Sequence, residues 1–379
     1  EWIDIAQQAG MKYIVFTTKH HDGFCMFDSQ LTDYDITQSP FQRDIVAEIA
    51  EACHKARFGL GFYYSLPDWR HPDYKTDHHE GYVEYLRGQV RELCENYGPV
   101  DILWFDGKRQ GTPETWDSDN LIRMIRKLQP KVLINDRFWG ETDFHTPEQV
   151  IGRFEPDRPW ESCITIGHQW SWKPNEQLKS WQECARLLAL VVGGGGNLLF
   201  NVGPMPSGAI QPRQVECLER IGEWLDRYGE SIYSTSAGPL EPSYWGASTH
   251  RDNSLYLHIL KGWETDLELP PIERHILSYQ NLTGGTAEVV QSSEVLRIKA
   301  SPVDPEKPLT LLKLTLDGPA SDIPYKGSNV GIPAGARAQG SNIRRGEEHY
   351  APTKAVDDDP LSRWATDDGV TEAWLEIEL

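Results

Sequence analysis

The sequence predicts an α/β protein whose larger part is a (β/α)8-like barrel and whose remainder is rich in β-strands. Up to about residue 230, apolar strands alternate with amphipathic helices, which is typical of parallel strands joined by right-handed crossovers. After Tyr233, short alternating strands between Pro and Gly turns replace the helices, as in an antiparallel β-sandwich. Polar residues follow several strands of the first part, where barrel enzymes place their chemistry.

Hydrophobic periodicity predicts each element of the barrel. Residues 1–10 have the pattern of the second half of an amphipathic helix that ends at a glycine. Strands are expected at 13–18, 59–64, 102–105, 132–135, 150–151, 163–166 and 197–201. Helices are expected at 44–56, 80–96, 121–128, 177–191 and 212–228. Because an eight-stranded barrel needs more strands than these, we expect the first strands of the barrel, and any targeting signal, to lie upstream of this chain.

A doubly wound open sheet is the alternative to a barrel. Such a sheet usually carries a Gly-rich phosphate loop between a strand and a helix. The four glycines at 193–196 precede a strand instead, so they do not match that motif and favour a tight or flexible connection.

The chain is expected to hold three parts and a linker. The catalytic barrel would span 1–232 and the antiparallel β-sandwich domain 233–326. The sandwich is predicted from alternating runs at 254–260, 295–298 and 309–316. A linker rich in Gly, Ala and Pro follows at 327–340, and the β-rich segment 341–379 is too short to form a sandwich of its own.

Composition limits the class of partner. There are 37 basic and 57 acidic residues, which gives a net charge of −20. This charge disfavours nucleic acid and anionic membrane surfaces and favours neutral or cationic ligands. No apolar stretch of the sequence is as long as a membrane span. The six cysteines lack CxxC spacing, so we expect buried thiols rather than a disulfide frame or a zinc site.

The segment 100–107 is the clearest candidate for a catalytic strand. Its apolar residues 102–105 precede Asp106 and Gly107, which places one carboxylate at the C-terminal end of a buried strand. An acid beside aromatic surface is common in sites that cleave sugars. The structural alternative is that Asp106 caps a helix.

Further functional groups follow the neighbouring strands. They include histidines, an arginine, acids and aromatic rings, namely His20, His21, Tyr63, Arg137, Glu148, Glu161 and Trp170. Aromatic rings stack on sugar faces, and fixed donors and acceptors pair with hydroxyl groups. Two carboxylates are the minimum equipment for cleaving a glycosidic bond. The set therefore favours a neutral, polyhydroxylated ligand.

Five motifs together resemble a known family. They are KHHDGFC at 19–25, FYYS at 62–65, LWFDG at 103–107, TPE at 146–148 and NLLFNVGP at 197–204. In this order they are similar to the retaining α-L-fucosidases of glycoside hydrolase family 29, over nearly all of residues 1–235. The run 160–172 is similar to the subgroup that prefers α-1,3/1,4-linked fucose on branched glycans. Residues 355–379 resemble the opening third of a discoidin-type carbohydrate-binding module.

The resemblance implies a role for each matched residue. Asp106 would be the nucleophile that forms a covalent fucosyl-enzyme, and Glu148 would be the general acid and base. The fucose-binding residues would be His20, His21, Tyr63, Trp104, Arg137 and Trp170. The resemblance implies no cofactor and no metal, a fucosylated oligosaccharide or glycoprotein glycan as substrate, and a secreted or periplasmic enzyme.

Several alternatives remain at this point. Glu155 or Glu161 is the alternative to Glu148 as proton donor. Adjacent His20 and His21 would also suit a metal-dependent, amidohydrolase-like barrel. A non-catalytic sugar-binding protein would keep the aromatic pocket without needing paired acids. Within the family, the alternative is a fucosidase of broader linkage specificity.

Three features have structural interpretations. Asp136 is expected to pair with local backbone or with Arg137. Trp170 and Trp172 alternate along the chain, and one of them is expected in the core. The acidic run 357–359 is expected to form either part of a calcium loop or a solvated turn.

Overall fold

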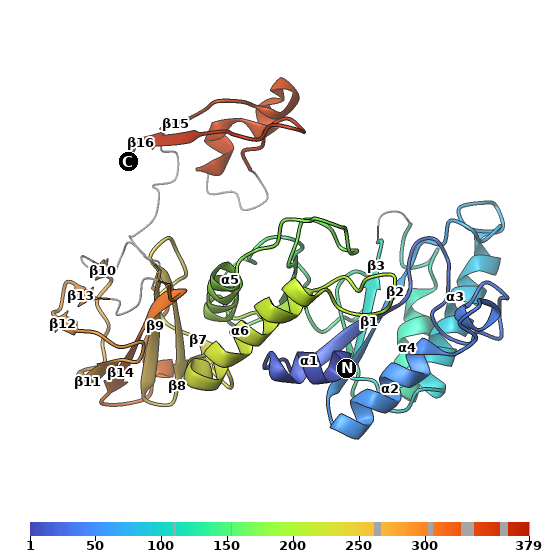
Figure 1. Ribbon diagram of the computed structural model, residues 1–379, viewed down its shortest axis with the longest axis horizontal. Helices are drawn as coiled ribbons and strands as arrows, with labels where there is room; N and C mark the ends of the chain where they lie inside the picture. The colour runs from blue at the N-terminus through green and yellow to red at the C-terminus, as the bar shows by residue number, and fades with distance from the viewer. Residues whose placement is uncertain are drawn as a thin grey trace. The chain divides into compact units, whose positions relative to one another are not determined.

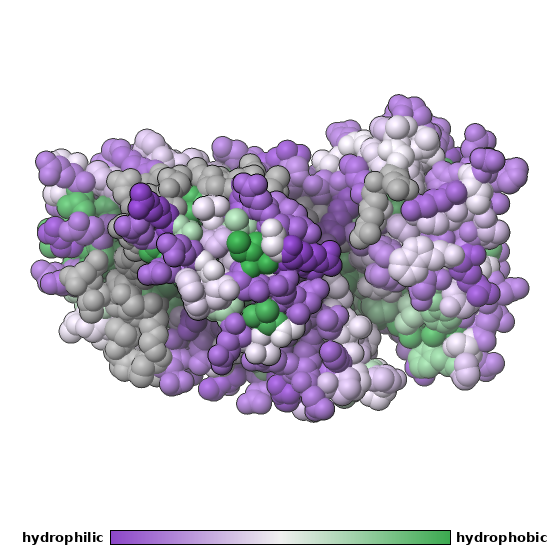
Figure 2. Space-filling model, turned by 90° about the horizontal axis from the view of Figure 1, so that it is seen from above, coloured by the Kyte–Doolittle hydropathy of each residue, from purple (hydrophilic) through white to green (hydrophobic). Residues whose placement is uncertain are grey.

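The computed structural model describes residues 1–108, 111–152, 154–260, 267–301, 306–326, 337–356 and 363–378. The chain divides into two compact units, Glu1–Ser236 and Ala237–Leu379, whose elements are labelled in Figure 1. Hydrophilic side chains cover most of the face drawn in Figure 2, in keeping with the net charge of −20. In the described part of the chain, no helix is both long enough and apolar enough to cross a membrane.

Parallel strands form the centre of the first unit. Four of them pair in chain order, namely β1 (Tyr13–Lys19), β2 (Gly59–Ser65), β3 (Ile102–Asp106) and β4 (Leu133–Ile134). A second parallel pair joins β5 (Glu161–Thr165) and β6 (Asn197–Asn201). Single parallel bridges connect Asn135 to Phe144 and His145 to Trp160. The segment 144–148 therefore lies between β4 and β5, and the strand order follows the chain order, as it does in a barrel.

Among the described residues of the same unit there are six α-helices. They are α1 (Trp2–Gln8), α2 (Ile45–Ala56), α3 (His79–Glu95), α4 (Ser118–Leu128), α5 (Trp181–Gly193) and α6 (Pro212–Tyr228), with 3-10 turns at Ile36–Gln38 and Gly229–Ser231. Asp44 begins α2 by accepting a hydrogen bond from the Ala47 amide at 2.8 Å. Ser180 and Glu183 form a capping box that begins α5, which explains why this helix starts later than the expected residue 177.

One predicted strand is wrong. Val150 lies in a bend, Ile151 lies outside any regular element, and both side chains are exposed. The sheet position expected for them is taken by the preceding residues, since Glu148 bridges to Cys163. Two adjacent apolar residues are too short a signal to define a strand.

Side chains of β2 and β3 alternate between two hydrophobic cores. Phe62 of β2 and Leu103 and Phe105 of β3 pack in the cluster that includes residues of α2, α3 and α4. The intervening Tyr63 and Trp104 belong to a separate inner cluster. Because successive residues of a strand point to opposite faces, Asp106 follows Trp104 onto the inner face.

The second unit is β-rich. Its largest sheet has the order β11-β14-β9-β8-β7, with β7 (Ser236–Ala237), β8 (Gly246–Arg251), β9 (Ser254–Leu260), β11 (Ile276–Asn281) and β14 (Leu309–Leu316). A three-stranded sheet contains β10 (Leu267–Leu269), β13 (Leu296–Ala300) and β12 (Ala287–Gln291). Leucines and isoleucines from both sheets share one core, for example Leu257, Leu314 and Ile298.

The end of the chain differs in part from expectation. Residues 327–336 of the expected linker 327–340 lie outside the described residues. The last four residues of that linker form a strand, β15 (Arg337–Gly340), which pairs with β16 (Leu375–Glu378). Short 3-10 turns occur at Ala320–Asp322, Arg344–Gly346, Glu348–Tyr350 and Pro352–Ala355. The acidic run 357–359 lies outside the described residues.

A buried ion pair fixes the loop that follows β1. Lys19 Nζ lies 3.5 Å from Asp68 Oδ2, and the side chains are 0% and 3% exposed. Burial lowers the pKa of Lys19 to about 8, although the nearby Asp68 charge raises it in part. Asp68 also accepts hydrogen bonds from the amides of Arg70 and His71 at 3.0 Å. The pair thus ties the end of β1 to the loop after β2.

We expect Asp68→Ala to lower the free energy of unfolding by about 3–5 kcal/mol, because it leaves the Lys19 ammonium buried without its counter-charge. Urea denaturation followed by tryptophan fluorescence would measure the loss. The matched control is Glu48→Ala, which breaks the exposed Arg43–Glu48 pair (2.8 Å) and should cost about 0–1 kcal/mol. Equal, small losses in both variants would contradict the assigned role of the buried pair.

Candidate functional site

Asp106 lies at the C-terminal end of β3, directly beside Ser65 at the end of β2. The following residue, Gly107, has a positive φ of 86°. A Cβ atom at this position would lie 2.3 Å from Pro67 Cδ and 3.3 Å from His21 Cε1. Only glycine lets the chain pass so close to these neighbours, so the turn after the acid depends on it.

Three side chains surround the Asp106 carboxylate. Tyr63 donates its hydroxyl proton to Oδ2 at 2.8 Å, and Arg137 Nη1 donates to Oδ1 at 2.7 Å. His21 Nε2 lies 3.9 Å from Oδ2. All three come from neighbouring strands or from the loops at their C-terminal ends.

Arg137 brings a second acid to the same place. Its Nη1 atom also donates to Glu148 Oε2 at 2.7 Å. One nitrogen is therefore shared by the carboxylates of Asp106 and Glu148. Since each oxygen lies 2.7 Å from that nitrogen, the two oxygens cannot be farther apart than twice that distance.

The Arg137 guanidinium is itself held in place. Nε donates to Thr146 Oγ1 and Nη2 donates to the Thr146 carbonyl, both at 3.1 Å, and the group lies 4.5 Å from the centroid of the Trp104 ring. Asp136 accepts hydrogen bonds from the Thr146 amide and hydroxyl at 3.1 and 2.8 Å. Asp136 is thus a structural residue that pairs with local backbone, as the sequence predicted.

Electrostatics keep Asp106 ionised. Burial raises the pKa of its carboxyl group, but Arg137, the Tyr63 hydroxyl and the Gly107 amide together lower it more, so the pKa lies below the ordinary 3.8. Burial and the adjacent Asp106 charge raise the pKa of Tyr63. The phenol therefore keeps its proton and remains a donor to the carboxylate.

Aromatic rings form a wall beside the two acids. The ring of His20 stacks on that of Tyr63, with centroids 5.6 Å apart and an interplanar angle of 5°. Tyr63 stacks on Trp104 at 5.7 Å and 20°. The rings of His20 and His21 lie 4.2 Å apart, because these residues follow the end of β1 rather than extending it.

The alternative acids have different surroundings. Glu161 is buried and accepts hydrogen bonds from Trp104 Nε1 at 3.0 Å and from the Tyr13 hydroxyl. Burial raises the pKa of Glu161, although these hydrogen bonds lower it in part. Glu155 lies near Gly194, whose carbonyl accepts its amide proton. Among the described contacts, Arg137 connects Asp106 to Glu148 and to neither of these two acids.

Trp170 is not brought into the aromatic wall by any ring contact in the described part of the chain. It lies in the segment that follows β5, and its side chain is exposed, whereas Trp172 is partly buried. Likewise, the described residues contain no group of three or more His, Cys, Asp or Glu side chains placed to hold a metal ion.

The sequence placed Ser65 in the FYYS motif without assigning it a role, and it did not single out Trp69. Ser65 Oγ lies 2.5 Å from His21 Nδ1. The Trp69 amide donates to the His21 carbonyl at 2.8 Å. The rings of Trp69 and His21 lie 5.4 Å apart, and Trp69 is 71% exposed. The period of two along β2 could have found Ser65, since it places this residue on the same face as Tyr63.

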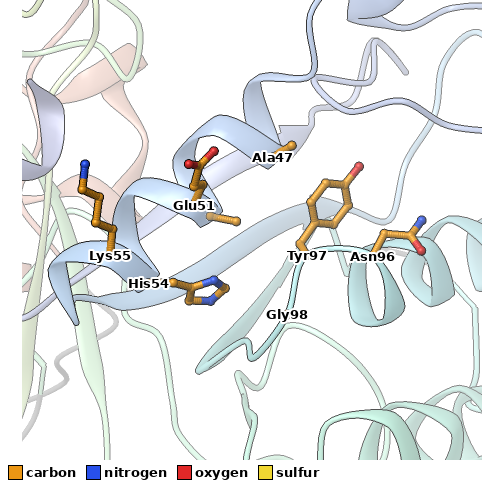
Figure 3. A pocket seen from close by; sticks show the side chains of 8 residues that line it. Ala47, Glu51, His54, Lys55, Asn96, Tyr97 and Gly98 are labelled. Carbon is orange, nitrogen blue, oxygen red and sulfur yellow. The ribbon is translucent and has the colours of Figure 1, made fainter.

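A separate hollow lies at the other end of the strands (Figure 3). It is lined by Ala47, Ala50, Glu51, His54, Lys55, Asn96, Tyr97 and Gly98. These residues belong to α2 and to the turn after α3, which lead into the N-terminal ends of β2 and β3. The hollow is therefore remote from the acids at the C-terminal strand ends.

A β/α unit with two carboxylates at its strand ends and an aromatic wall has the site type of barrel glycoside hydrolases. The α-L-fucosidase family profile matches residues 1–230, and the chain belongs to this family. The family and its solved structures give the chain a (β/α)8-like catalytic domain and a β-rich domain.

Individual relatives agree with this assignment. Plasma α-L-fucosidase of Homo sapiens is 32% identical over 71% of this chain and 63% of its own length. Tissue α-L-fucosidase of Macaca fascicularis is 32% identical over 62% of this chain and 54% of its own length. The chain thus spans between about half and two thirds of these two relatives.

Solved structures cover more of the chain. α-L-Fucosidase isoenzyme 1 from Paenibacillus thiaminolyticus is 35% identical, with a TM-score of 0.75, over 83% of this chain and 86% of that one. A family 29 α-L-fucosidase from Bacteroides thetaiotaomicron, described as a covalent intermediate trapped with 2-fluoro-fucosyl fluoride, is 25% identical with a TM-score of 0.75 over 84% and 81%.

We expect Arg137→Gln to raise the pKa of Asp106, because burial still opposes ionisation while the main stabilising charge is gone. Carbon-13 NMR titration of labelled aspartate carboxyls, assigned with Asp106→Asn, would give a value below 3.8 in the wild type and a higher one in the variant. Since the folded pKa is depressed, the stability that Asp106 contributes is present above its unfolded pKa and is lost as the pH falls through the folded pKa.

The control is Arg126→Gln, which removes a partner of Asp143 (2.7 Å) and should leave Asp106 unchanged. An Asp106 pKa that stays the same in Arg137→Gln would show that this arginine does not hold the carboxylate ionised.

Proposed function

We propose that the chain carries the catalytic site of a retaining exo-α-L-fucosidase that releases terminal α-1,3/1,4-linked fucose from branched oligosaccharides or glycoprotein glycans. The observation that carries the proposal is the Arg137 nitrogen shared by Asp106 and Glu148, each at 2.7 Å. Retaining glycosidases hold their two carboxyl groups about 5–5.5 Å apart, whereas inverting enzymes need about 6.5–9.5 Å to admit a water molecule. The two oxygens that share this nitrogen cannot lie more than twice 2.7 Å apart, which supports the shorter spacing.

In this proposal Asp106 attacks the anomeric carbon of fucose while Glu148 gives a proton to the departing oxygen. The C–O bond to the leaving group breaks as the Asp106–sugar ester forms. Glu148 then takes a proton from water, which attacks the ester and restores the α configuration. The depressed pKa of Asp106 supports its role as nucleophile. The trapped covalent intermediate of the Bacteroides thetaiotaomicron relative supports the same two-step course.

The wall of His20, Tyr63 and Trp104 supports an aromatic boundary for the sugar beside the acids, and His21 offers a polar atom to a hydroxyl group. Arg137, whose N–H groups are engaged by the chain itself, would act through the two carboxylates that it holds. Trp170, whose side chain is exposed, is proposed as a further sugar contact on the resemblance alone. The net charge of −20 suits a neutral glycan.

The finer parts of the proposal rest on sequence resemblance. The run 160–172 supports the α-1,3/1,4 preference, and 355–379 supports a discoidin-type module within 341–379. The proposed domain limits are 1–232 and 233–326. We also propose a secreted or periplasmic location.

Proton NMR of the hydrolysis of fucosylated trisaccharides tests the function directly. Retention predicts that α-fucose appears first and mutarotates later, and α-1,3/1,4 preference predicts faster release than from α-1,2- or α-1,6-linked substrates. Initial β-fucose would contradict retention. Loss of turnover with a chelator, restored by metal, would favour the amidohydrolase-like alternative instead.

Asp106→Ala should lower turnover by several orders of magnitude, because the covalent step loses its nucleophile. Added azide should partly restore turnover by attacking from the vacated face, and the product should be β-fucosyl azide. Mass spectrometry and NMR identify the product. Unchanged turnover in the variant would remove Asp106 from the mechanism.

Glu148→Ala should slow natural glycans far more than 4-nitrophenyl fucoside, since a nitrophenolate leaves without a proton whereas a sugar alkoxide does not. Comparing kcat/KM for both substrates measures this dependence. Glu155→Ala is the matched control and should affect both substrates equally and slightly. If the leaving-group dependence appears in Glu155→Ala instead, the proton donor has been assigned to the wrong residue.

A further inference from the structure

We infer that Ser65 is a positioning residue that fixes the tautomer of His21, with the proton on Nδ1 and the lone pair on Nε2. The tautomer follows from contacts of the chain itself, and only its kinetic consequence rests on the proposed fucosidase function.

Ser65 occupies a fully buried position at the end of β2. It lies on the same inner face as Tyr63 and pairs in register with Asp106 of β3. Its hydroxyl oxygen has two close polar neighbours, namely the Pro67 carbonyl oxygen at 2.7 Å and His21 Nδ1 at 2.5 Å. The hydroxyl therefore connects the loop after β2 to the imidazole beside the nucleophile.

The donors and acceptors allow one arrangement. A carbonyl oxygen can only accept, so the single hydroxyl proton of Ser65 must point to Pro67. What Ser65 presents to His21 is then a lone pair, and Nδ1 must carry a proton to meet it. In a neutral imidazole the other nitrogen, Nε2, is then an acceptor.

Further contacts hold both ends of this chain of hydrogen bonds. Lys19 Nζ also donates to the Pro67 carbonyl oxygen, at 3.5 Å, so this oxygen accepts from two side chains. The Trp69 amide donates to the His21 carbonyl at 2.8 Å. The backbone of His21 and the segment 67–69 are thus tied together, which leaves the imidazole little freedom to turn away from Ser65.

The tautomer matters because His21 Nε2 lies 3.9 Å from Asp106 Oδ2. A proton on Nε2 would point a donor at the nucleophile and withdraw charge from it. With a lone pair there, His21 accepts a hydrogen bond from a ligand hydroxyl instead. Ser65 therefore preserves the reactivity of Asp106 and makes His21 select a hydroxyl donor on the substrate.

Long-range proton–nitrogen NMR of the protein labelled with nitrogen-15 histidine tests the tautomer. The spectrum is recorded at alkaline pH, where imidazole is neutral, and the His21 signal is identified by its loss in His21→Asn. In the wild type we expect a protonated Nδ1 and an unprotonated Nε2. A wild-type spectrum with the proton on Nε2 would overturn the inference without the use of any variant.

Ser65→Ala removes the acceptor, and Ser65→Thr keeps the hydroxyl group. We expect the Nε2–H form to appear in Ser65→Ala, while Ser65→Thr keeps the wild-type pattern. Thermal unfolding checks that each variant is folded. A folded Ser65→Ala variant that retains the pure Nδ1–H form would show that something other than Ser65 sets the tautomer.

Kinetics separates this inference from the proposed function. Ser65→Ala should lower kcat/KM for a fucoside roughly 10–100-fold, by analogy with the loss of a partner that orients a metal-binding imidazole, and Ser65→Thr should recover most of it. If the wild type hydrolyses no fucoside but shows the expected tautomer, only the proposed function fails. If it hydrolyses fucosides and the loss in Ser65→Ala is the same in a His21→Asn background, only the inference fails.

Discussion

The Arg137 guanidinium organises the site because one of its nitrogens binds both carboxylates, each at 2.7 Å. Without this positive charge, the half-buried Asp106 carboxylate would lose the partner that lowers its pKa. The arginine thus allows Asp106 to remain ionised while Glu148 stays within reach of the same atom. Everything proposed for the chemistry depends on this three-membered arrangement.

The surrounding residues hold Arg137 and the two acids in place through hydrogen bonds, a ring contact and a buried ion pair. Thr146, which is held by Asp136, orients the guanidinium through two hydrogen bonds. The Trp104 ring packs against the guanidinium. The buried Lys19–Asp68 pair holds the loop that carries His20 and His21. Charge, hydrogen bonding and ring packing therefore act together at the C-terminal ends of the strands.

The sequence predicts those parts of the fold and site that depend on residues close together in the chain. The apolar run before Asp106 and the alternation along β2 and β3 predict both strands and the inward-facing residues. The resemblance of the TPE motif favours Glu148 over Glu155 and Glu161, but the residues alone left all three open, because acids within one stretch differ chiefly in their spatial neighbours. The contact of Arg137 with Glu148 across the strand ends supports the first choice. Ser65 belongs to the FYYS motif but received no role, because a small hydroxyl group gives no sign in the sequence of the partner that it contacts.

Gly107 has a consequence for how this site can change over time. A Cβ atom there would lie 2.3 Å from Pro67. The turn after Asp106 therefore tolerates almost no substitution, whether by natural drift or by directed evolution in the laboratory. New substrate preferences are therefore expected to arise in the outer loops, such as the one with the exposed Trp69, while the backbone turn that positions Asp106 stays the same.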